Sequence, residues 1–202
     1  GQIIDSSDIE IISSKRWTTS LAPDQFKNIT GLDSYPEYLQ KDVKSDTLNI
    51  YCNGEINYTI KGTHAKVSVI WNYKAPEGTG DTHQSSMRGS KSDLIIKQGE
   101  AENFKPTLYV TSKEEGEFES TLKQALESIQ GDYPGVTADK VSDSQWKIVI
   151  PEILKIGHEA HFGQVTENFL KYYKNSKLPE WEVPNMITKY YTTKQAYKKA
   201  IN

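Results

Sequence analysis

One stretch of the chain alternates apolar and polar residues so regularly that it constrains the fold more than any other. Between Ala65 and Tyr73, every second side chain is apolar or aromatic. Successive side chains of a β-strand point to opposite faces, so this period of two predicts a strand with one buried face. A second alternating run, Glu55 to Lys61, precedes it, and the intervening Gly62-Thr63 predicts an antiparallel hairpin.

The remaining pattern places strands first and helices late. Ser112 stands three residues before Glu115, a capping-box spacing that predicts the start of a helix. The other predicted elements are strands at 93–97 and 107–111, a hairpin at 136–150, and helices at 157–174 and 184–200; segment 1–45 shows no long element. Because strands and helices do not alternate, we predict an α+β fold with an open, mostly antiparallel β-sheet and helices packed on one face.

The composition is typical of one folded domain over residues 1–202. Hydrophobic residues make up 36% of the chain, and no stretch rich in Pro, Gly or Ser divides it. A formal net charge of −3, with lysines interspersed among acids, argues against nucleic acid as a partner. No apolar run approaches the roughly 20 residues that span a bilayer. The lone Cys52 excludes an internal disulfide and leaves the compartment open between the periplasm or cell envelope and the cytoplasm.

The segment between Tyr73 and Ser90 is the main candidate for a ligand site. Structureless connections of more than ~12 residues are usually functional or mobile. Carboxylates can accept hydrogen bonds from sugar hydroxyls, a histidine can donate or accept near neutral pH, and an arginine can bind a carboxylate. The predicted substrate-contacting residues are Glu77, Asp81, His83 and Arg88 of this segment, Trp71 at its approach, and His161 of a later helix. The alternative is a turn whose glycines meet backbone demands and whose His83 caps a strand end.

Neither a nucleotide nor a metal is recognised by the spacing of these residues. Gly78-Thr79-Gly80 lacks a third small residue three positions on, where His83 stands, so the dinucleotide fingerprint fails. His158 and His161 lie three apart, whereas a zinc-protease pair needs histidines four apart and a third ligand. A metal hydrolase that uses this pair with a distant acid is a third hypothesis. His161 could equally tie the start of its helix to a neighbouring loop.

Several separated motifs resemble one known family in the same order. They are KRWTTSLAPDQFKNITGLDSYPEY, WNYKAPEGTGDTH, DYPGVTA, IGHEAHFGQVTENFL and LPEWEVPNMITKYYTT. Together they look like the C-terminal domain of a branch of the Gfo/Idh/MocA oxidoreductase superfamily, the family labelled putative oxidoreductase C-terminal domain. The superfamily's Gly-rich fingerprint and its Glu-Lys-Pro segment are absent, and the chain starts without an initiator Met or a signal pattern. We therefore expect a preceding segment that carries them.

This resemblance implies a division of labour. An N-terminal Rossmann domain of the same protein would bind NAD or NADP, and the present chain would supply part of the pocket for a sugar-like or cyclitol-like substrate. Such domains often form the subunit interface, so a homo-oligomer is expected. The chain alone would have no catalytic residue and no cofactor. A second hypothesis, from another class, is a noncatalytic carbohydrate- or protein-binding module that uses the same loop.

Overall fold

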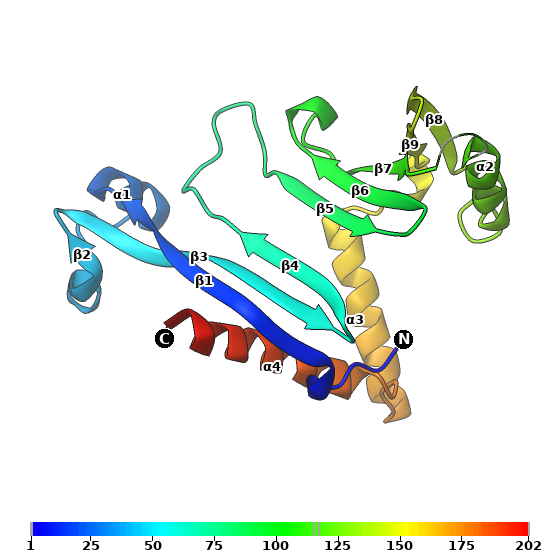
Figure 1. Ribbon diagram of the computed structural model, residues 1–202. Helices are drawn as coiled ribbons and strands as arrows, with labels where there is room; N and C mark the ends of the chain where they lie inside the picture. The colour runs from blue at the N-terminus through cyan, green and yellow to red at the C-terminus, as the bar shows by residue number, and fades with distance from the viewer. Residues whose placement is uncertain (1, 115, 117, 202) are drawn as a thin grey trace. The chain divides into compact units, whose positions relative to one another are not determined.

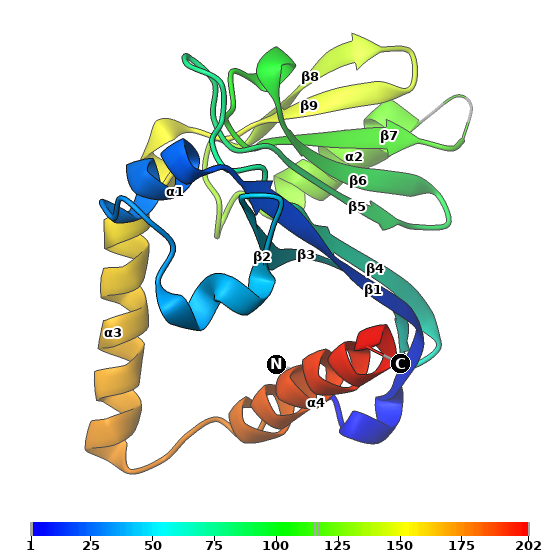
Figure 2. The ribbon, with the colours of Figure 1, turned by 90° about the vertical axis from the view of Figure 1, so that its left-hand side faces the viewer.

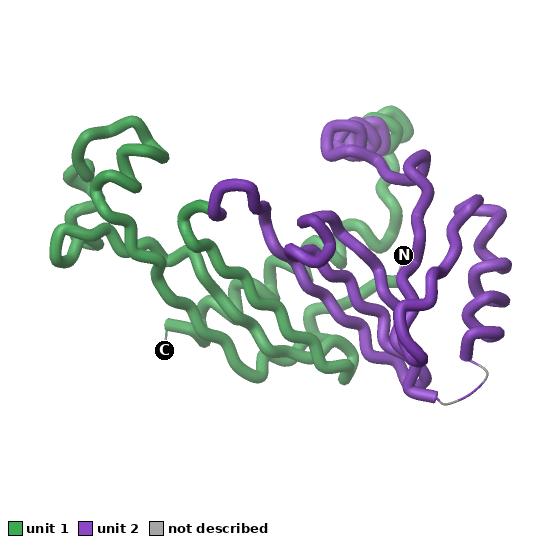
Figure 3. The backbone as a smooth tube through the Cα atoms, turned by 90° about the horizontal axis from the view of Figure 1, so that it is seen from above, with its two compact units in different colours: residues 1–74, 169–202 green, residues 75–168 purple. Residues whose placement is uncertain are grey.

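The structure, a computed structural model, describes residues 2–114, 116 and 118–201 (Figure 1). Its backbone divides into two compact units (Figure 3). Unit 1 contains residues 1–74 and 169–202, and unit 2 contains residues 75–168. Each unit has its own antiparallel sheet. The expectation of a single domain stays a prediction.

Unit 1 is built around one long central strand. Its elements are β1 (Ile9–Leu21), α1 (Pro23–Thr30), β2 (Val43–Lys44), β3 (Thr47–Ile60), β4 (Thr63–Val69) and α4 (Glu182–Ile201). The order is β1-β3-β2, and β4 pairs with the second half of β3. The predicted hairpin is confirmed, with Ile60 opposite Thr63 and Lys61-Gly62 as the turn. Both turn residues have positive φ, 49° and 77°, as a two-residue type I′ turn requires.

The long first strand is the main element that the sequence pattern did not reveal. Segment 1–45 was expected to lack a long element, yet β1 runs for 13 residues and pairs with β3 along its length. Register shifts occur between Ile11 and Ser13 and between Trp17 and Thr18. A β-bulge adds a residue and reverses the alternation beyond it. The first shift inserts Ile12 into β1, and the second inserts Cys52 into β3. The period of two that would have predicted β1 is therefore broken at Ile12.

The alternating run from Ala65 to Tyr73 is only partly a strand. β4 ends at Val69, and the predicted burial of its apolar face is wrong, since Val67 is 47% and Val69 60% exposed. The reason is that α4 packs against β1, and β1 and β4 pair with opposite edges of β3 (Figures 1 and 2). An edge strand can keep an alternating sequence without a partner layer over it.

The last helix confirms the predicted helix at 184–200 and holds the start of the chain. Ala196 is 2% exposed, and its carbonyl accepts a hydrogen bond from Ser14 Oγ at 2.6 Å. One turn after the start of α4, Asn185 Oδ1 accepts from the Ile4 N–H at 2.8 Å, and Thr188 Oγ1 donates to the Ile4 carbonyl at 2.8 Å. These bonds fix α4 along β1 and the residues that precede it.

A charge cluster crosses the sheet of unit 1 on its other face. Glu55 of β3 lies between Lys66, at 3.0 Å, and Lys15, at 3.5 Å. The hydrogen bond from Lys66 lowers the pKa of Glu55, and the charge of Lys15 adds to the effect. A carboxyl whose pKa is lowered on folding contributes stability at neutral pH, and this contribution is lost as the pH falls through the folded-state pKa.

Glu55→Gln is therefore expected to flatten the acid side of the stability profile. The wild-type protein should lose more stability than the variant between neutral pH and the acidic range in which Glu55 protonates, and the difference should vanish below it. Chemical denaturation at a series of pH values measures this. Glu10→Gln is the matched control, because it removes the same charge from an exposed position on β1. An identical profile for Glu55→Gln and the wild type would contradict the assignment.

Unit 2 carries a five-stranded antiparallel sheet with one helix against it (Figure 3). Its elements are β5 (His83–Arg88), β6 (Ser92–Gln98), β7 (Thr107–Ser112), α2 (Phe118–Ser128), β8 (Thr137–Ser142) and β9 (Gln145–Val149), in the sheet order β5-β6-β7-β9-β8. The core consists of Val110, Phe118, Leu122, Val136, Trp146 and Ile148. The predicted strands at 93–97 and 107–111 and the hairpin at 136–150 are confirmed. Because α2 and α4 each lie on a sheet, the predicted α+β architecture is confirmed as well, although divided over two sheets.

Two of the predicted helices differ from the prediction, one at its start and the other in its burial. Ser112 is the last residue of β7, and its Oγ accepts the Glu114 N–H at 3.0 Å; the capping-box partner, Glu115, lies outside the described residues. The predicted helix at 157–174 is α3 (His158–Asn175), but its apolar face is not buried, and its Phe162, Val165 and Phe169 are all exposed. Periodicity defines an apolar stripe but does not identify what covers it.

Within the described chain, no helix is long and apolar enough to cross a membrane.

Candidate functional site

The predicted site segment folds partly as a strand. Residues 83–88 form β5, so the irregular connection is 70–82, and it links the two sheets rather than two strands of one hairpin. β5 is an edge strand and all six of its residues are exposed. Its sequence, HQSSMR, lacks an apolar alternation because neither of its faces is buried, and the sequence pattern could not reveal it.

Asp81 and His83 lie beside the same residue of β6. His83 is the cross-strand partner of Gln98, and Gln98 Nε2 donates a hydrogen bond to the Asp81 carbonyl at 2.9 Å. Both side chains are exposed, so they are free to meet a ligand at this end of the sheet. The structure thus brings together these two of the six predicted residues.

Local turn geometry and packing explain the presence of the glycines in the loop. Gly78 has φ +78°, in a turn where the Thr79 N–H and Oγ1 both donate to the Pro76 carbonyl, at 3.1 and 2.6 Å. A Cβ at Gly80 would lie 3.2 Å from Phe104 Cβ, a tight contact that a larger residue could make only if Phe104 shifted slightly. These facts favour the turn interpretation for the glycines, while Glu77 lies exposed in the same turn.

Arg88 lies at the other end of β5. It is five residues from His83, about 17 Å along a strand, and an odd separation sends the two side chains to opposite faces of the sheet. Asp93 of β6 is its cross-strand partner. Arg88 and His83 therefore do not converge on one small ligand.

Trp71 and His161 occupy different settings from the loop residues. Trp71 belongs to unit 1, where its backbone N–H donates to Asn53 Oδ1 at 2.7 Å and its backbone carbonyl accepts from Thr19 Oγ1 at 2.5 Å. It is half-buried against the cluster that contains Leu21 and Leu48, which indicates a packing role. His161 is exposed in the first turn of α3.

The histidine pair shows no metal-binding geometry. His158 Nδ1 lies 3.6 Å from the exposed Glu159, and its ring contacts Phe162, with 4.8 Å between the ring centroids. Across residues 2–114, 116 and 118–201, no group of three or more His, Cys, Asp or Glu side chains could hold a metal ion.

The face of the unit 2 sheet opposite α2 carries one perturbed group. Tyr109 of β7 donates its hydroxyl to Glu102 Oε1 at 3.2 Å, and Lys97 Nζ lies 5.5 Å from its ring centroid. Burial raises the pKa of Tyr109, and the hydrogen bond to Glu102 and its charge raise it further. The phenol therefore stays protonated at neutral pH and serves as a hydrogen-bond donor rather than a base.

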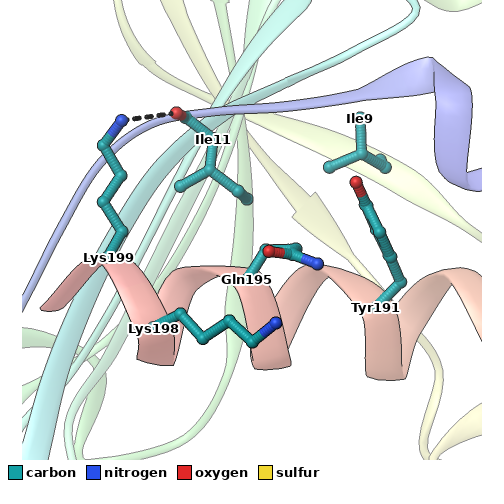
Figure 4. A pocket seen from close by; sticks show the side chains of 6 residues that line it. All are labelled: Ile9, Ile11, Tyr191, Gln195, Lys198 and Lys199. Carbon is teal, nitrogen blue, oxygen red and sulfur yellow. Dashed lines mark hydrogen bonds between the residues drawn. The ribbon is translucent and has the colours of Figure 1, made fainter. Parts of the chain in front are cut away.

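Two cavities lie away from all six predicted residues. The cavity of unit 1, about 460 Å³, lies between the start of β1 and the later turns of α4 (Figure 4). The cavity of unit 2, about 340 Å³, lies between α2 and the β8–β9 hairpin and is lined by Leu122, Leu126, Val136, Ala138, Lys140 and Trp146, among others. In the sequence, the first cavity is indicated only by the spacing of Tyr191, Gln195 and Lys199, which places these residues on one face of a helix. Because β1 was not predicted as a long strand, the sequence did not show what this face of the helix packs against.

The comparisons with known proteins agree on one family. Residues 1–201 match the family model described as "Putative oxidoreductase C terminal domain". This chain belongs to that family. A solved structure titled as a putative oxidoreductase from Parabacteroides merdae ATCC 43184 is 54% identical in sequence, with a TM-score of 0.96. Among curated proteins, none matches.

The structural match covers different shares of the two chains. The solved oxidoreductase is covered over 46% of its own length, while 98% of the present chain is covered. The chain thus spans less than half of that relative. The matches confirm both the predicted C-terminal-domain family and the fold class.

Proposed function

We propose that this chain is the substrate-side domain of an NAD(P)-dependent oxidoreductase of the Gfo/Idh/MocA type, acting on a carbinol of a sugar or cyclitol. The observation that carries the proposal is the family match over residues 1–201, together with the 46% coverage of the solved oxidoreductase. More than half of such a protein is then available for a domain that binds NAD or NADP.

The loop of unit 2 supports placing the cofactor on the partner domain. A dinucleotide fingerprint needs a glycine-rich turn that opens into a helix, whose N-terminus binds the pyrophosphate. Here Gly78-Thr79-Gly80 leads into the edge strand β5 instead. In this proposal the chain is inactive alone because it cannot hold the nucleotide.

Substrate positioning is the contribution left to this domain. Hydride transfer requires the donor carbon within about 3–3.5 Å of the acceptor, so the substrate must be held in one orientation. We place Asp81, His83 and Glu77 against substrate hydroxyls, because the first two share Gln98 as a neighbour and all are exposed. Arg88 would serve a carboxylate or a second contact at the other end of β5. For Trp71 and His161, which were chosen from their places in the sequence, the contacts of the described residues add no support.

The proposal also includes a homo-oligomer. The exposed apolar face of α3, with Phe162, Val165 and Phe169, offers the apolar surface that interfaces use.

Cofactor binding and turnover by the complete protein test the proposal. We expect saturable binding of NAD(H) or NADP(H) and oxidation of at least one member of a panel of aldoses, uronates and inositols, followed by nicotinamide absorbance. The chain 1–202 alone, checked for folding by circular dichroism, should bind neither dinucleotide. Micromolar dinucleotide binding by 1–202 alone would overturn the division of labour. Sugar binding by the complete protein without any cofactor binding or turnover would favour a noncatalytic module.

A further inference from the structure

We propose that the cavity between β1 and α4 binds a small hydroxylated anion, such as a sugar carboxylate or a sugar phosphate. Ile9 and Ile11 of β1 and Tyr191, Gln195, Lys198 and Lys199 of α4 line it (Figure 4). All six belong to unit 1. Its volume of about 460 Å³ falls in the range that small-molecule sites occupy.

The charge of the lining is entirely positive. Two of the six lining side chains are lysines and none is acidic. The nearest acid in sequence, Glu10, lies between Ile9 and Ile11 on β1 and points to the opposite face of the sheet. An anion entering this cavity therefore meets no carboxylate from the lining.

The two lysines differ in what they already bind. Lys199 Nζ donates to the Ile11 carbonyl at 3.2 Å, which fixes its ammonium group at the edge of β1. Two of its protons remain available for a ligand. Lys198 forms no ion pair or hydrogen bond within the described part of the chain. Its ammonium group is thus the charge most available to an anion.

The neutral side chains of the cavity suit the hydroxyl groups and ring of a sugar. Gln195 is half-buried on α4, and its amide lies between Ile11 and Tyr191 in Figure 4. Neither that amide nor the Tyr191 hydroxyl has a partner among the residues that the structure describes. Together they offer three donor hydrogens and two acceptor oxygens. Ile9, Ile11 and the tyrosine ring supply apolar surface for the C–H face of a sugar ring.

A purely structural role explains only part of this arrangement. Lysines near the C-terminus of a helix interact favourably with its dipole, which would account for Lys198 and Lys199 by themselves. The dipole does not account for a half-buried amide and a phenol that face the same cavity without partners. Gln195 is half-buried and Tyr191 is 38% exposed, so both groups are open to solvent, and a ligand hydroxyl can replace the water that meets them. A hydroxylated anion satisfies the cations and the neutral groups at once.

Calorimetric titration of the complete protein without any dinucleotide tests the proposal. The probes are D-glucuronate, D-glucose 6-phosphate and D-glucose. We expect saturable binding of at least one of the two anions and at least about tenfold weaker binding of glucose. Glucuronate alone would identify a carboxylate site and the phosphate alone a phosphate site; binding of both would assign the shared anionic chemistry.

Two variants of the same helix separate the site from a general charge effect. Lys198→Gln should weaken anion binding at least about tenfold, because it removes the most available charge. Lys194→Gln, one turn earlier and outside the lining, removes the same charge and should change affinity less than about twofold. Unchanged circular dichroism and melting temperature would show that both variants fold.

Three results would overturn the proposal. They are no saturable binding of either anion at millimolar concentration, glucose binding as tight as that of the anions, and an equal loss of affinity in both variants. The titration uses no nicotinamide cofactor and measures no turnover. Failure of the oxidoreductase proposal would therefore leave this result unaffected, and the reverse also holds.

Discussion

Replacing Trp146 with alanine is expected to destabilise unit 2 by about 3 to 5 kcal/mol. Trp146 is 4% exposed and lies in the core cluster beside Val110 and Ile148. Its ring packs against Phe118 of α2, with 5.3 Å between the centroids, so it joins the helix to the sheet. Removing the indole leaves a cavity between α2 and the sheet. Urea denaturation followed by circular dichroism measures the loss.

Trp146→Phe is the matched control, and it should cost much less, about 1 to 2 kcal/mol. Within the described residues, the indole Nε1 is buried and has no hydrogen-bond partner. The substitution keeps an aromatic ring against Phe118 and removes an N–H that makes no bond, which by itself is neutral or favourable. A cost equal to that of alanine would show that the N–H is bonded, for example to a buried water.

Replacing His83 with alanine in the complete enzyme is expected to lower kcat/KM at least about tenfold with little change in melting temperature. His83 is exposed at the first position of β5, so its side chain contributes little to packing. The expected loss comes from a missing contact to a substrate hydroxyl beside Asp81. Steady-state kinetics and thermal denaturation of the same preparations measure the two effects.

Gln84→Ala is the control for this prediction. Gln84 is the next residue of the same edge strand, is equally exposed, and points to the opposite face of the sheet. Its substitution should leave kcat/KM within about twofold of the wild type. A large fall in the melting temperature of His83→Ala would favour the strand-capping role. Equal kinetic losses in both variants would place the effect on strand pairing rather than on a ligand contact.

The sequence pattern predicted elements best where alternation or helical periodicity ran unbroken. The β3–β4 and β8–β9 hairpins and the helices α3 and α4 lie close to their predicted positions. β1 was not predicted as a long strand, because the bulge at Ile12 breaks its alternation. β4 was recognised as a strand, but its predicted buried face is exposed, because local alternation is the same whether or not another layer covers the strand.

The candidate sites also combine features that the sequence predicted with features that only the structure revealed. The glycine-rich loop was found from its composition, yet only the pairing of β5 with β6 showed that Asp81 and His83 share a neighbour while Arg88 faces the other way. The cavity lined by Ile9 and Lys198 could not be predicted from the sequence, since these residues are far apart in it.

By itself, the sequence determined the family, the antiparallel α+β character and the local elements, because these depend on periodicity and on motifs within short stretches. Only the tertiary structure decided which distant side chains meet, which apolar faces stay exposed and where cavities form. The physical reason is that backbone alternation sets the direction of a side chain relative to its own element. Packing between elements then sets what that side chain faces.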